Sequence, residues 1–184
     1  SDGVVLDFDG REDGDAIGAT DVESALAAAG HEIKPLDIVL VRTGCDRWID
    51  TAEYMAHGPG VTAGATHWLY ERGVRVMGID AWGWDRPLWM QAQEAIESGE
   101  QGIFWEAHQA DLAYSQIDRL VNLASLPPTG FTVSCLPLPL VGGSAPGGRE
   151  RGHGLRLHAP LRRLGVPHRA PRLRPRGPRH GHRL

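Results

Sequence analysis

GHEIKPLDIVLVRTG, residues 30–44, is the stretch that decides the fold of this chain. Within it, Ile38-Val39-Leu40-Val41 is an uninterrupted apolar run, which predicts a strand covered on both faces. Gly30 stands where the residue after a helix belongs, because glycine accepts the left-handed backbone of a helix end. Thr43-Gly44 ends the strand. The stretch therefore predicts a helix–loop–strand unit.

The same alternation continues on both sides of this unit. Toward the N-terminus, Val4 to Phe8 predicts a buried strand, and Thr20-x-x-Glu23 is a capping box that opens the helix ending at Gly30. Toward the C-terminus we expect helices over 62–71 and 88–98, strands over 74–79, 103–105 and 131–136, and either a strand or a helix over 116–123. Alternating strands and helices indicate the α/β class.

Composition excludes several kinds of protein. No run of about 20 apolar residues is present, and the N-terminal residues show no signal-peptide pattern, so we expect a cytoplasmic protein that crosses no membrane. Cys45 and Cys135 are far apart in sequence, which predicts neither a disulfide framework nor a cysteine-based zinc site.

Residues 146–184 differ in kind from the rest. The segment from Ser144 onward holds 11 Arg and 5 His with a single acid, Glu150, although the whole chain has a net charge of −4. We therefore expect a domain over 1–145 and an Arg/Pro/Gly/His-rich tail over 146–184 that is disordered or frame-shifted. A basic arm that binds nucleic acid or another anion is the alternative interpretation.

Few residues suggest chemistry on their own. His108 and Asp118 are ten positions apart and can both reach one divalent ion if the chain turns between them. Asp80 to Asp85 places two carboxylates and two indoles, Trp82 and Trp84, after a predicted strand, where ligands of α/β sheets gather. His57 and His67 suggest surface or packing positions.

Three strings together resemble the cyclase family of metal-dependent hydrolases, which includes bacterial kynurenine formamidase and isatin hydrolase. They are GHEIKPLDIVLVRTG over 30–44, GPGVTAGATHWLYERGVRVMGIDAWGWDRP over 58–87, and FWEAHQADLAYSQIDRLVNLASLPPTGFTVSCLPLPLVGGSA over 104–145. The resemblance implies a swivelling β/β/α domain. It also implies that His108 is a metal ligand and that Asp118 stands where the family has a Glu ligand, just before Asn122-Leu123. Asp is shorter by one methylene, which puts a bridging role between two ions in doubt.

The family's His-x-Gly-Thr-His-x-Asp stretch, which supplies most metal ligands and a general acid/base His, has no match in residues 1–184. The resemblance thus implies the C-terminal two thirds of such an enzyme, with no catalytic residue in this chain and with its last strand replaced. We expect an incomplete copy with little activity of its own.

The function implied by the resemblance is hydrolysis of a carbon–nitrogen amide bond, as by an arylformamidase of tryptophan catabolism to kynurenine. The substrate would be N-formylkynurenine or a cyclic amide, the cofactor Zn or Mn, and Trp82 and Trp84 would contact the substrate. The expected partners are a small aromatic amide and further copies of the chain, with no membrane and no nucleic acid. A non-catalytic structural or dimerisation domain, or anion binding through the tail, are the alternatives.

Overall fold

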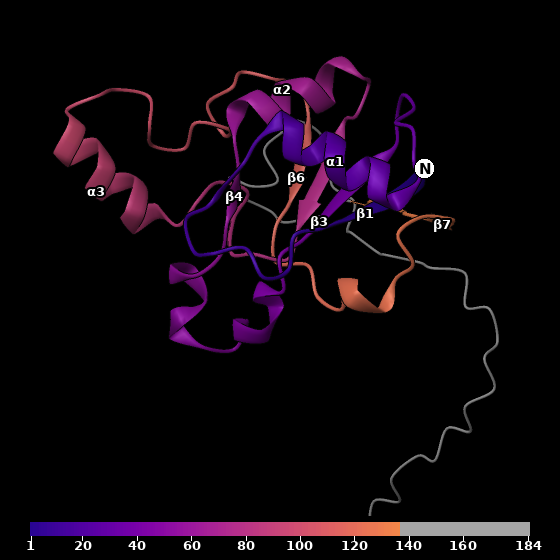
Figure 1. Cartoon of the computed structure of the whole chain (residues 1–184), viewed down its shortest axis with the longest axis horizontal. Helices are drawn as coiled ribbons and strands as arrows, with labels where there is room; N and C mark the ends of the chain where they lie inside the picture. Colours follow the sequence, from indigo (N-terminus) through magenta and orange to yellow (C-terminus); the bar gives the residue numbers. More distant parts are fainter. Residues whose placement is uncertain (137–184) are drawn as a thin grey trace, which may run out of the picture.

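The computed structural model describes residues 1–136, and the predicted tail over 146–184 lies outside them. Its centre is a five-stranded sheet in the order β6-β5-β3-β1-β7 (Figure 1). The strands are β1 (Asp2–Asp7), β3 (Ile38–Arg42), β5 (Val76–Ile79), β6 (Ser115–Ile117) and β7 (Phe131–Thr132), with β2 (Ala16–Ile17) and β4 (Gly60–Val61) pairing separately. The helices are α1 (Ala19–Ala29), α2 (Ala63–Glu71) and α3 (Leu88–Ser98), with 3-10 turns η1 (Cys45–Trp48), η2 (Ala52–Ala56) and η3 (Leu123–Ser125). The α/β class is confirmed.

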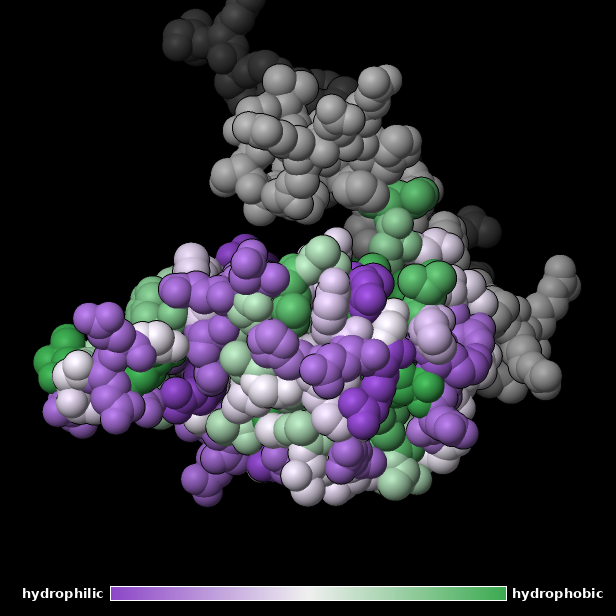
Figure 2. Space-filling view, turned by 90° about the horizontal axis from the view of Figure 1, so that it is seen from above, coloured by the Kyte–Doolittle hydropathy of each residue, from purple (hydrophilic) through white to green (hydrophobic). Residues whose placement is uncertain are grey.

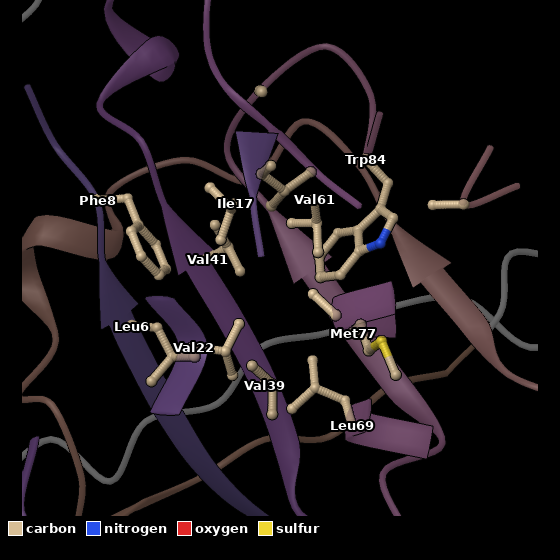
Figure 3. Close-up of a cluster of buried hydrophobic side chains, with 14 of the residues drawn as sticks. Leu6, Phe8, Ile17, Val22, Val39, Val41, Val61, Leu69, Met77 and Trp84 are labelled. Carbon is tan, nitrogen blue, oxygen red and sulfur yellow. The ribbon is translucent and has the colours of Figure 1, made fainter. Parts of the chain in front are cut away.

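β3 lies at the middle of the sheet, as its apolar run predicted. It pairs in parallel with β1, placing Val4 opposite Val39, and with β5, placing Met77 opposite Val39. Val39 and Val41 belong to the larger core cluster, while Ile38 and Leu40 belong to a second cluster on the other face. Side chains alternate across a strand, so burial of four successive residues requires cover on both faces. Figure 3 shows the larger cluster around Val39 and Val41.

Helix α1 starts two residues earlier than predicted. Its N-terminal cap is Gly18, whose N–H donates to the Asp21 carboxylate at 2.9 Å, and Thr20 lies inside the helix. The predicted capping box at Thr20 and Glu23 is therefore wrong, because Asp21 makes the reciprocal bond instead. The predicted end is confirmed, since Gly30 has the left-handed φ of 64°.

Two predicted strands differ in the structure. Residues 103–105 form no strand but lead into a turn in which Trp105 has a left-handed φ of 55°. The strand expected over 131–136 is only β7, which pairs antiparallel with the start of β1. Segment 116–123 contains the end of β6 and the start of η3, so neither single alternative covers it.

Helix α3 projects from the body of the molecule (Figure 1). Gln91 is its only buried residue, whereas Trp89 and Ile96 are 52% and 83% exposed. Figure 2 shows this projection with hydrophobic patches among hydrophilic ones. Among residues 1–136, no helix has the length and apolar character that crossing a membrane requires.

Candidate functional site

A cavity of about 270 Å³ opens where the carboxyl ends of β5 and β6 meet. Its walls come from the residues that follow these two strands, from the loop after η2 and from the start of α3. The polar residues that line it are His57, Asp85, Arg86, His108, Asp118 and Arg119. Parallel strands place their following loops at one sheet edge, so segments distant in sequence converge there.

Asp80 directly follows β5 and bonds the residues that follow β3. Its carboxylate accepts hydrogen bonds from the Thr43 N–H at 2.7 Å, the Thr43 hydroxyl at 2.6 Å and the Gly44 N–H at 2.9 Å. The Tyr54 hydroxyl donates to its carbonyl. Asp80 is buried, which raises the pKa of its carboxyl against the effect of the three donors. It does not line the cavity, so its role is to fix the strand ends on which the cavity is built.

His108 is held in the cavity wall by Asp85. One Asp85 oxygen accepts the Ala107 N–H at 2.9 Å, and the other pairs with Nδ1 of His108. The ring also stacks on Trp105 with 5.3 Å between centroids. The hydrogen bond to Asp85 raises the pKa of His108. Because Nδ1 is engaged, Nε2 is the nitrogen left for a ligand.

Asp118 follows β6 directly and reaches the same cavity. The residue as a whole is exposed, yet the packing around its carboxyl group raises its pKa by desolvation, against the influence of His108 and Arg119. Asp118 lines the cavity together with His108, and its carboxylate is of a kind that can bind a cation there. The structure thus brings His108 and Asp118 to one concave surface.

These residues fit a divalent metal ion in kind. Imidazole nitrogen and carboxylate oxygen are ligands of Zn²⁺ and Mn²⁺. A metal-binding His commonly donates its other ring N–H to a carboxylate, as His108 is placed to do toward Asp85. In the described part of the chain, no group of three His, Cys, Asp or Glu side chains is arranged to hold an ion. Two ligands at this cavity are therefore what residues 1–136 offer, and their role stays a prediction.

The two indoles expected to face a substrate have separate positions. Trp82 lines the cavity, and the Arg119 guanidinium lies 5.3 Å from its ring centroid. Trp84 is fully buried, and its Nε1 donates to the Thr66 hydroxyl at 2.9 Å. Figure 3 shows its ring turned into the core beside Val61. The expectation of substrate contact by Trp84 is corrected, because a side chain without exposed surface cannot touch a ligand.

His57, assigned by sequence to the surface or to packing, lines the cavity. Its Nδ1 lies 2.7 Å from an Asp13 oxygen. His67 is exposed on α2, as expected. Asp13 and His57 are 44 positions apart, so no local pattern could have paired them. The sequence signal for Asp85 was better, since it ends the Asp80–Asp85 segment already singled out.

One family model matches part of the chain. Residues 1–86 match the model described as "Putative cyclase". The matched residues include Trp82 and Asp85 but not His108 or Asp118. No curated protein matches the sequence.

Solved structures share the fold. An isatin hydrolase bound to the product analogue thioisatinate superposes with a TM-score of 0.64 at 22% identity, covering 78% of this chain and 55% of that one. Isatin hydrolase A from Ralstonia solanacearum gives 0.62 at 24% identity, covering 78% and 56%. Isatin hydrolase A from Labrenzia aggregata, bound to benzyl benzoate, gives 0.59 at 23% identity, covering 77% and 56%. The chain spans a little over half the length of these proteins, and at such identities the likeness establishes the fold alone.

Proposed function

We propose that this protein is a member of the cyclase family, whose model residues 1–86 match, and that it hydrolyses a carbon–nitrogen amide bond with a divalent metal ion. The observation that carries the proposal is the meeting of His108 and Asp118 at one cavity, with Asp85 holding the His108 ring. A family match without such a cavity would support only a shared fold.

In this proposal His108, through Nε2, and Asp118 hold Zn²⁺ or Mn²⁺. The bound ion would lower the pKa of a coordinated water and polarise the substrate carbonyl. With a proton on Nδ1 shared with Asp85, His108 would present an unprotonated Nε2 to the ion. Catalytic zinc sites commonly use three protein ligands. Because residues 1–136 supply two, we expect weak metal binding and turnover below the usual enzyme range of about 1–10³ s⁻¹.

The proposed substrate is a small aromatic amide, either an N-formyl arylamine such as N-formylkynurenine or a cyclic amide such as isatin. Trp82 and Trp105 line the cavity and offer apolar rings. A cavity of about 270 Å³ lies just below the range of about 300–1,000 Å³ of pockets for drug-sized ligands, so it suits a smaller molecule. An isatin hydrolase with a bound product analogue is among the proteins of this fold, which supports the cyclic amide as a test substrate.

The test is hydrolysis of N-formylkynurenine and of isatin by the protein in saturating Zn²⁺ or Mn²⁺, compared with the metal alone. We expect a slow, metal-dependent rate that His108→Gln abolishes, whereas His67→Gln on the exposed face of α2 retains it. A protein that binds the ion at His108 but hydrolyses neither substrate above the blank would contradict the proposal and favour a non-catalytic structural domain.

A further inference from the structure

A second histidine–aspartate pair, built like the first, places its histidine in the wall of the cavity. Asp85 bonds Nδ1 of His108 with one oxygen and the N–H of the preceding residue, Ala107, with the other. Asp13 bonds Nδ1 of His57 with one oxygen at 2.7 Å and the N–H of the following residue, Gly58, with the other at 2.7 Å. Each aspartate thus holds both the ring of its histidine and the backbone N–H of the residue next to that histidine. Both histidines line one cavity, and each has Nε2 left for a ligand.

The loop that carries His57 is held by backbone bonds as well. The Gly14 N–H donates to the Gly58 carbonyl at 2.8 Å, and the Gly60 N–H donates to the Asp15 carbonyl at 2.9 Å. The His57 ring also stacks on Trp48 with 4.8 Å between centroids. A ring held on two sides and at its backbone is pre-organised, which is what a group acting on a substrate requires.

His57 stands apart from the candidate metal ligands. In the described residues no third His, Cys, Asp or Glu joins His108 and Asp118 in an arrangement that could hold an ion. His57 therefore shares the cavity with these two residues without completing a metal site. An imidazole in this position is suited to exchange protons with a substrate or with the attacking water.

We propose that His57, oriented by Asp13, is the residue that carries the proton during amide hydrolysis in this cavity. This inference rests on the proposed function. Neutral His57 takes a proton at Nε2 from the attacking water as its oxygen bonds to the amide carbon, and the carbonyl electron pair moves onto the carbonyl oxygen. The imidazolium then gives that proton to the amide nitrogen as the carbon–nitrogen bond breaks. The products are a carboxylic acid and an amine, and His57 is neutral again.

The first experiment reads the ring directly, in the ¹⁵N-labelled protein, from two-bond ¹H–¹⁵N spectra of the histidines. We expect His57 with its proton on Nδ1 and an unprotonated Nε2. In Asp13→Asn the amide N–H₂ faces Nδ1, so the proton should move to Nε2. Zn²⁺ alone should shift His108 but not His57, and isatin should shift His57 but not the exposed control His67. A proton on Nε2 of His57 in the unaltered protein, or no response to isatin, overturns the proposal.

The second experiment separates a proton carrier from a metal ligand. His57→Gln should lower kcat by about 100-fold or more, with the Kd for Zn²⁺ unchanged, and Asp13→Asn should lower kcat less. His67→Gln should leave both unchanged. Should His57→Gln weaken Zn²⁺ binding tenfold, the residue is a ligand and the proposal fails. Should it leave kcat within about twofold, which lies far outside the range expected for acid–base catalysis, the pair is structural and the proposal also fails.

The two proposals can fail separately. If the unaltered, metal-loaded protein hydrolyses neither substrate while isatin still shifts His57, the hydrolase function is refuted and the proton transfer falls with it, although ligand contact by His57 stands. If hydrolysis occurs and His57→Gln does not slow it, the function stands and the assignment of His57 alone is refuted.

Discussion

Replacing Asp85 by Asn tests the histidine–aspartate arrangement on which the proposed metal site depends. The Asp85 side chain is only 4% exposed and accepts two hydrogen bonds, from Ala107 and at Nδ1 of His108. An Asn can keep the first bond with its oxygen. It then turns its N–H₂ toward Nδ1, which forces Nδ1 to accept and moves the proton of His108 to Nε2. The nitrogen expected to bind the ion is thereby blocked.

The expected loss is a 10- to 100-fold weaker Kd for Zn²⁺, which is what removal of such an orienting partner costs in metal sites. In free energy this is about 1.4–2.8 kcal/mol. The fold should persist, because Asn is of nearly the same size and the bond to Ala107 remains. Isothermal titration with Zn²⁺ measures the affinity, and thermal unfolding checks the fold. Asp50→Asn, a change at an exposed position, is the matched control and should bind as the unaltered protein does.

The reasoning is refuted if Asp85→Asn binds Zn²⁺ within about twofold of the unaltered protein, well short of the expected factor, while His108→Gln abolishes binding. It is equally refuted if ring spectra of the unaltered protein place the proton of His108 on Nε2. An unaltered protein that binds no Zn²⁺ would instead refute the assignment of His108 and Asp118 as ligands.

Three further outcomes are expected. Zn²⁺ affinity should fall as the pH falls toward the ordinary His pKa of about 6.5, because a protonated ring cannot bind metal. The fall should start above that value, because Asp85 raises the pKa of His108. Titrations that give one Kd from pH 5.5 to 8, a range of about one unit or more on either side of that value, would contradict this. Asp80→Asn should lower the free energy of unfolding by about 1–3 kcal/mol, because an amide group replaces the acceptor of the Gly44 N–H, and urea denaturation that finds no change would show that the bond contributes nothing. Trp84→Ala should destabilise the fold by about 3–5 kcal/mol, because Trp84 is fully buried. Trp82→Ala should destabilise the fold less, because Trp82 is only partly buried against the core, and it should weaken isatin binding. Equal stability losses would contradict the core and cavity assignments of the two indoles.

The sequence by itself determined the parts of the fold that depend on local pattern. The apolar run over 38–41 predicted a strand covered on both faces, and Gly30 predicted the end of α1. Both follow from rules that act within a few residues, namely the alternation of side chains along a strand and the left-handed backbone that glycine accepts. The strand expected over 103–105 is absent, and of the alternating stretch over 131–136 only Phe131–Thr132 pairs in the sheet, because pairing with a neighbouring strand depends on the tertiary structure.

Only the tertiary structure decided which residues meet at the cavity. His108 and Asp118 were singled out from sequence, but Asp85 and Asp13 acquire their roles by contacting rings 23 and 44 positions away. Trp82 and Trp84, two positions apart, looked alike in sequence. In the structure Trp82 lines the cavity, whereas Trp84 is buried in the core. Spacing along the chain fixes neither result, because both depend on how the loops after parallel strands converge at one edge of the sheet.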